Sequence, residues 1–184
     1  MEFTQINPIT KIEKIDKQSF LKNYEKITNV CLRILASHEK TLSHKEMENA
    51  KNYLYNVCTD LFLDGEAYFF VLTRDKKPVS FCIYSAHPQK QNAYIMEMIY
   101  THSQLSNCGY GTLCLEHSLN QMKKLGATEV ILTVNNKNQS SMHMHNKLIE
   151  KGICKGTTQK DEYTTKFYFD LDSLNLSNDP EACL

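Results

Sequence analysis

The stretch between residues 93 and 125 constrains the fold more than any other part of the sequence. Residues 93–101 (AYIMEMIYT) are apolar, aromatic and β-branched, as is typical of a strand. A loop containing Gly109 and Gly111 follows, and then a helical stripe formed by Leu115, Leu119, Met122 and Leu125. A second strand is predicted at residues 129–134. The alternation of strands and helices from here on predicts a right-handed parallel crossover late in the chain.

The remaining segments add two helices and two strands before this unit, and a helix and a strand after it. Apolar residues recur every three or four positions in two early segments, and Ser43 and Glu46 have the spacing of a capping box. Helices are therefore predicted at 17–36, 45–62 and 138–151, and further strands at 67–73, 79–85 and 163–171. This order predicts an α+β fold.

Length and charge bound the class of protein. The 184 residues are 41% hydrophobic and 23% charged, which excludes a disordered or collagen-like chain. We expect one domain over residues 1–172 and a short acidic tail over residues 173–184. Lys plus Arg equal Asp plus Glu at 21 each, so we expect neither a nucleic acid nor a membrane as partner.

Targeting and cysteine usage indicate a cytoplasmic protein, in its own cell or in a host cell. Residues 1–17 carry charges throughout, without the apolar region of a signal peptide, and no apolar run is long enough to span a bilayer. The seven cysteines are scattered and never form C-x-x-C, which favours reduced thiols. No standard zinc spacing fits the nearby candidates His102, Cys108, Cys114 and His117, so we expect no metal.

Residues 101–113 (THSQLSNCGYGTL) are the best candidate for a ligand site. A loop between a strand and a helix offers unpaired amide groups and the positive end of the helix dipole, which together hold phosphate. A Walker A loop would end in Gly-Lys-Ser/Thr, and a Rossmann loop would have a third glycine at Cys114, so neither fits. The alternative is an ordinary tight turn before a helix.

This loop and a second motif resemble the GNAT superfamily of N-acetyltransferases. The family's pyrophosphate loop reads Val-x-Pro-x-x-Arg/Gln-Gly-x-Gly-x-Gly/Ala, and alignment on Gly109 and Gly111 keeps its register from Thr101 onward. The second signature, Asn-x-x-Ala-x-x-Leu-Tyr-x-Lys-x-Gly-Phe, resembles residues 138–148, with the closing pair at Gly152 and Ile153. The chain departs from these patterns at Ser106, Asn107 and His145.

The resemblance implies a mixed, mostly antiparallel sheet with helices on both faces and a splayed parallel strand pair. The pantetheine arm of acetyl-CoA would enter between those strands, and an amine of a small molecule or peptide would attack the thioester directly. This implies an N-acetyltransferase, with the oligomeric state left open. The residues implied to bind the cofactor are Ile99, Thr101, Ser106, Asn107, Cys108, Gly109, Tyr110, Gly111, Thr112, Asn138, Ser141 and His145.

Glu97 and His145 are the candidates for proton transfer. Regular alternation places Glu97 on the same strand face as Ile99 and Thr101, where its carboxylate could deprotonate the amine. Backbone amides near Ile99 and Thr101 would polarise the carbonyl. His145 stands where the family has a tyrosine thought to protonate the departing thiolate, and a pKa near the ordinary 6.5 would suit that role. The alternatives are a solvent-facing or salt-bridged glutamate and a surface histidine.

Two other functions stay open at this stage. The departures from the family pattern are compatible with a degenerate domain that binds CoA or a protein partner as a regulator, and a cofactor-free interaction module is a third class. Acidic residues in segments that the family uses near the acceptor are compatible with a cationic amine: Glu39, Glu46, Glu48, Asp64, Glu66, Asp161 and Glu162.

Overall fold

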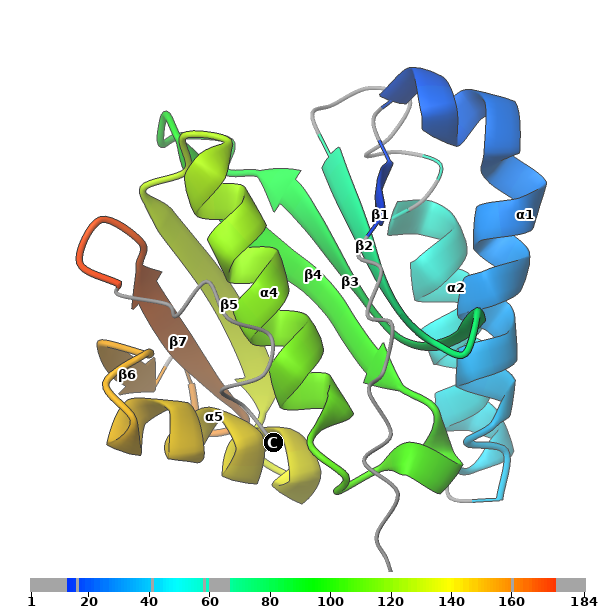
Figure 1. The fold of residues 1–184 in the computed structure, drawn as a ribbon. Coiled ribbons are helices and arrows are strands. Elements are labelled where there is room, and N and C mark those ends of the chain that lie inside the picture. Colours follow the sequence, from blue (N-terminus) through cyan, green and yellow to red (C-terminus); the bar gives the residue numbers. More distant parts are fainter. Residues whose placement is uncertain are drawn as a thin grey trace, which may run out of the picture.

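The described strands form one seven-stranded sheet in the order β1-β2-β3-β4-β5-β7-β6 (Figure 1). The computed structural model describes residues 13–15, 17–40, 42–57, 59, 67–159 and 161–174. The strands are β1 (Glu13–Ile15), β2 (Ala67–Arg74), β3 (Lys77–Ala86), β4 (Ala93–Thr101), β5 (Glu129–Asn135), β6 (Gly156–Gln159) and β7 (Thr164–Asp170). Only the pair β4 and β5 is parallel among the described strand pairs, so the predicted mixed, mostly antiparallel sheet is confirmed.

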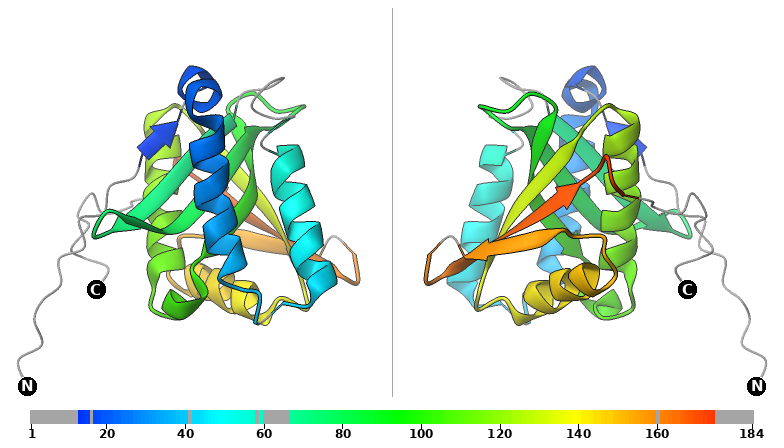
Figure 2. Two further views of the ribbon diagram at one scale, coloured as in Figure 1. Left: turned by 90° about the vertical axis from the view of Figure 1, so that its right-hand side faces the viewer. Right: turned by 90° about the vertical axis from the view of Figure 1, so that its left-hand side faces the viewer.

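Helices cover both faces of the sheet, as predicted (Figure 2). They are α1 (Lys17–Ala36), α2 (His44–Asn56), the short 3₁₀ helix η2 (Ser103–Leu105), α4 (Tyr110–Lys124) and α5 (Gln139–Glu150). One apolar core joins α1 and α2 to one face of the sheet. A second core joins α4 and α5 to the other face. None of the described helices is long and apolar enough to cross a membrane.

The predicted elements differ from the structure mainly at their ends. The capping box is present, because Ser43 Oγ accepts from the Glu46 amide and the Glu46 carboxylate accepts from the Ser43 amide. The α-helical part of the second helix runs from His44 to Asn56, and the end predicted for it at residue 62 lies outside the described residues. The strands β1 and β6 were not predicted, because three and four residues are too few to show alternation. Of the predicted acidic tail, residues 175–184 lie outside the described part.

The two parallel strands separate soon after they begin. Their pairing covers Ala93 with Glu129, Tyr94 with Val130, and Ile95 with Ile131. Both strands then continue, β4 to Thr101 and β5 to Asn135, without pairing to each other. The splayed strand pair is therefore confirmed, and it leaves a gap in the middle of the sheet.

Candidate active site

The loop of residues 106–112, here called the cradle, leads from β4 into α4 and presents free backbone amides. Gly109 is the N-cap of α4 and has a left-handed φ of 83°, and Asn107 has a φ of 63°. Within the described part of the chain, hydrogen-bond acceptors are found for the amides of Ser106 and Cys108. The amides that have none are those of Asn107, Gly109, Tyr110, Gly111 and Thr112. Such a row of donors at a helix N-terminus suits an anion.

Gly111 allows α4 to approach β4 and α5 closely. A Cβ atom at this position would lie 3.0 Å from Thr101 Oγ1 and 3.5 Å from Met144 Sδ. A Cβ at Gly109 would meet no atom within 4 Å, and the requirement for glycine there comes from its positive φ. The two glycines therefore serve different needs, close packing at Gly111 and backbone conformation at Gly109.

Side chains that the sequence motifs did not indicate hold the segment before the cradle and its first helical residue. Ser37 Oγ, just after α1, accepts a hydrogen bond of 2.8 Å from the Ser103 amide, and His38 Nε2 lies 2.7 Å from the Thr101 carbonyl oxygen. Arg74 Nη1 donates to the Tyr110 hydroxyl at 2.8 Å, and its guanidinium lies over the Tyr110 ring. These contacts fix the loop and bring a cation next to the cradle.

A β-bulge at Glu97 changes which side of the sheet this carboxylate faces. Met98 pairs with Ile83 and Met96 pairs with Tyr84, so Glu97 is an extra residue in β4. Met96 therefore lies in the core under α4, whereas Met98 lies in the core under α1 and α2.

The expectation that Glu97 shares a face with Ile99 and Thr101 is wrong for this reason. Ile99 packs against the core under α4, and Thr101 approaches Gly111 of α4. Glu97 instead accepts a hydrogen bond from Tyr53 of α2. One inserted residue has turned the remainder of the strand over, which sequence periodicity cannot reveal.

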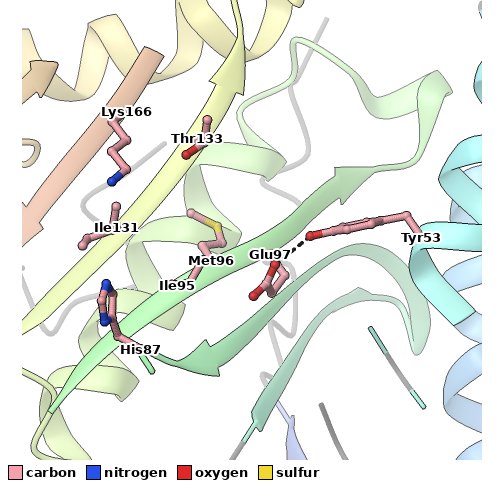
Figure 3. Close-up of a pocket in the computed structure, with 8 residues that line it drawn as sticks. All are labelled: Tyr53, His87, Ile95, Met96, Glu97, Ile131, Thr133 and Lys166. Atoms are coloured by element: carbon pink, nitrogen blue, oxygen red, sulfur yellow. Dashed lines mark hydrogen bonds between the residues drawn. The ribbon is translucent and has the colours of Figure 1, made fainter. Parts of the chain in front are cut away.

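Glu97 lines a cavity of about 350 Å³, here called the β4–β5 cavity (Figure 3). The cavity opens where the two parallel strands begin to separate, and its lining comprises Tyr53, His87, Ile95, Met96, Glu97, Ile131, Thr133 and Lys166. The Glu97 carboxylate accepts hydrogen bonds from Tyr53 Oη at 2.7 Å and from Ser85 Oγ at 2.5 Å. Burial and the adjacent Glu97 carboxylate raise the pKa of Tyr53, so its hydroxyl keeps the donated proton. Sequence reasoning missed this cavity apart from Glu97.

His145 is fully buried in α5, with its ring 4.9 Å from that of Phe167. Its Nδ1 atom lies 2.7 Å from the Ser141 carbonyl oxygen, and Asn138 caps the helix by accepting from the Ser141 amide. A carbonyl can only accept, so Nδ1 carries the proton and Nε2 is an acceptor in the neutral ring. Nε2 is buried and has no partner among the described residues.

The expected ordinary pKa of His145 is wrong. Burial lowers the pKa to about 4, against a weaker opposing effect of the hydrogen bond to Ser141. The alternative of a surface histidine is also wrong, because the side chain is fully buried. At neutral pH, His145 is therefore an uncharged imidazole with an unused acceptor.

The described acidic residues that the sequence suggested for the acceptor site lie elsewhere and not at the β4–β5 cavity. Glu39 lies 3.8 Å from Lys51, Glu46 belongs to the capping box, and Asp161 accepts from the amides at the start of β7. None of the described members of that set lines the β4–β5 cavity, and Asp64 and Glu66 lie outside the described residues. Within the described part, no three His, Cys, Asp or Glu side chains gather in a way that could hold a metal ion.

Known structures share this fold. The PaiA N-acetyltransferase of Thermoplasma acidophilum in complex with coenzyme A is 14% identical, with a TM-score of 0.58 over 88% of this chain and 98% of that one. The ribosomal-protein-S18-alanine N-acetyltransferase of Escherichia coli is 15% identical, with a TM-score of 0.55 over 93% and 99%. A GNAT-family acetyltransferase of Staphylococcus aureus Mu50 is 11% identical, with a TM-score of 0.58 over 88% and 99%.

The sequence itself carries the family assignment. No curated protein sequence matches this chain. The profile of the acetyltransferase (GNAT) family, however, matches residues 30–149, which include β4, the cradle, α4 and most of α5. That match spans more than half of the sequence, and the chain therefore belongs to the GNAT family of acetyltransferases.

Proposed function

We propose that this protein transfers an acetyl group from acetyl-CoA to an amine by direct attack on the thioester. The observation that carries the proposal is the position of β4. This strand presents Glu97 to the β4–β5 cavity where the sheet splits, and it leads at its other end into the cradle. A single strand thus connects a candidate base to a candidate pyrophosphate site along an open gap.

The described residues fit acetyl-CoA. Five free amides of the cradle suit the pyrophosphate, and the gap between β4 and β5 suits the pantetheine arm. Ile99 and Thr101 would contact that arm from β4, and Asn138 and Ser141 from the start of α5. The cofactor supplies the acetyl thioester, and the β4 backbone beside the gap would polarise its carbonyl.

Glu97 is the proposed base. The amine must lose a proton to attack, and the Glu97 carboxylate, held by two hydroxyl donors, can take it directly or through water. These donors fix the direction in which the carboxylate points. Because Tyr53 and Ser85 are neutral, the negative charge of Glu97 remains available to a cationic amine.

His145 is proposed to protonate the leaving sulfur. Because its burial keeps the ring neutral, it must first receive a proton at Nε2. Its Nε2 atom is free to accept a proton, but the neutral ring has none there to donate. An ammonium acceptor loses two protons when it becomes an amide. Glu97 would take the first, which frees the amine, and His145 would receive the second, which leaves the nitrogen after attack, at Nε2 and pass it to the sulfur. His145 would therefore not start the cycle charged.

The experiment is a release assay for the CoA thiol with acetyl-CoA and a pooled panel of amines. Release that depends on an amine, with the acetylated product found by mass spectrometry, is the expected result. Binding of acetyl-CoA without turnover would favour the regulator, and absence of binding would favour the interaction module.

A cytoplasmic location is also proposed, because the described cysteines are free thiols.

A further inference from the structure

The β4–β5 cavity has two ends of opposite charge. Figure 3 shows Glu97 and Tyr53 toward one side and Lys166 and His87 toward the other. Ile95 and Met96 of β4 lie between these ends, and Ile131 of β5 lies between Lys166 and His87. A carboxylate and an ammonium therefore face one space from separate strands.

The cationic end has unused hydrogen-bonding capacity. Lys166 is half-buried on β7 opposite Thr133, and among the described residues its ammonium makes no hydrogen bond or ion pair. Two lysines between α5 and β6 differ, since Lys151 and Lys155 reach Glu116 and Asp170. His87 Nδ1 accepts from the Gln89 amide at 3.1 Å, so its Nε2 carries a proton that can be donated.

The space is large enough for a small ligand. A volume of about 350 Å³ equals roughly a dozen water molecules at about 30 Å³ each, which suits a free amino acid. The Lys166 ammonium can donate, and a carboxylate in this space would accept a charge-assisted hydrogen bond from it. The apolar middle would contact the carbon skeleton that joins the two charged groups.

We infer that the acceptor is a small zwitterionic amine, an amino acid whose amino group lies at Glu97 and whose carboxylate lies at Lys166 and His87. This inference rests on the proposed function, because it assigns the acceptor of the same site. It does not follow from membership of the family, since Lys166 lies outside the matched residues 30–149.

The first test needs no variant. A panel of free amino acids is compared with the corresponding carboxamides, which keep the amine and lack the anionic group. We expect kcat/KM for the best amino acid to exceed that of its carboxamide by about tenfold or more, because one charge-assisted hydrogen bond is lost. Equal use of the two forms would overturn the inference. Better use of a peptide that extends the same residue would overturn it too.

The second test removes the cation. Lys166→Met should lower kcat/KM for the amino acid about tenfold and leave the carboxamide unchanged, and Lys166→Gln serves if the first variant does not fold. Lys124→Met, at the exposed end of α4, is the matched control and should change neither. Equal losses for both acceptors would show that Lys166 is structural and would refute its assignment.

Equilibrium binding separates this inference from the proposed function. Calorimetry with CoA-loaded protein should show that the amino acid binds more tightly than the carboxamide, and that Lys166→Met removes the difference. If acetyl-CoA binds and amines react without this preference, only the inference fails. If acetyl-CoA neither binds nor reacts, the proposed function fails. If the proposed function fails in this way, the amino acid and its carboxamide are titrated into the protein without CoA. Equal affinity for the two would then overturn the inference as well.

Discussion

At the scale of single residues, Glu97 is a carboxylate whose orientation is fixed by hydrogen bonds. Its two carboxylate oxygens accept from Tyr53 and Ser85, side chains that come from α2 and β3. A carboxylate held from two elements has little freedom to turn away from the cavity. Its position can therefore be tested separately from its charge.

Replacing Glu97 by Gln keeps the shape and removes the base. We expect kcat to fall by about a hundred- to ten-thousandfold, with acetyl-CoA affinity unchanged. Tyr53→Phe keeps the Glu97 carboxylate but removes one of its two hydrogen bonds, so kcat should fall by less than in Glu97→Gln. Steady-state kinetics and calorimetry measure both effects. An unchanged kcat in Glu97→Gln would remove this residue from the mechanism.

His145 should make the stability of the fold depend on pH. Its pKa is about 4 in the folded protein and about 6.5 when unfolded, so between these values the unfolded chain binds more protons. The free energy of unfolding should therefore fall by about 3 kcal/mol through this residue as the pH drops from 6.5 to 4.

Denaturant titrations at several pH values test this effect. His145→Phe, which cannot titrate, should lose less stability over that interval than the unchanged protein. His143→Phe is the control, because His143 is exposed on the same helix. Equal pH slopes for His145→Phe and the unchanged protein would contradict the prediction.

At the scale of elements, sequence patterns predicted most of the fold but not its local irregularities. Periodic segments predicted α1 and α4, because burial of one helix face imposes a regular spacing. Runs of apolar, aromatic and β-branched residues predicted β3 and β5, most of whose residues are buried. The bulge at Glu97 interrupts that spacing without any special residue type. The β4–β5 cavity was also missed, since it joins side chains from α2, β4, β5 and β7 that no local pattern relates.

The shape of the cradle was predicted more fully than the surroundings of the proposed catalytic residues. Gly109 and Gly111 are local signals, and backbone amides bind without regard to the side chains around them. The environment of His145 depends instead on Phe167, which lies far away in sequence. Burial and the resulting pKa could therefore come only from the assembled fold.

The close approach of α4 to β4 can be tested by a double-mutant cycle. Gly111→Ala alone should destabilise the protein by about 1 to 3 kcal/mol, because the new Cβ lies 3.0 Å from Thr101 Oγ1. Thr101→Ala removes that oxygen and should recover part of the loss in the double variant. Additive free energies of unfolding would show that the two residues do not interact.

At the scale of the whole molecule, the gap between β4 and β5 should become more ordered when the cofactor binds. We expect slower hydrogen exchange at gap-facing amides of residues 96–101 and 132–135, with no change in β6. At about 100 times its dissociation constant, acetyl-CoA should add about 2.7 kcal/mol of stability. Adenosine diphosphate should give part of this effect. Unaltered exchange across the gap at saturating acetyl-CoA would contradict this mode of binding.

The cradle and the β4–β5 cavity belong to opposite faces of the sheet, one at α4 and the other beside α2. Neither substrate would have to pass the other to reach the gap, so either can bind first. Initial-rate plots at several fixed acceptor concentrations should therefore intersect, as for a ternary-complex mechanism, and each substrate should bind to the free enzyme in calorimetry, as random order requires. Parallel lines would require an acetylated enzyme instead. The split sheet would thus let each substrate reach the gap from its own face, without a fixed order of binding.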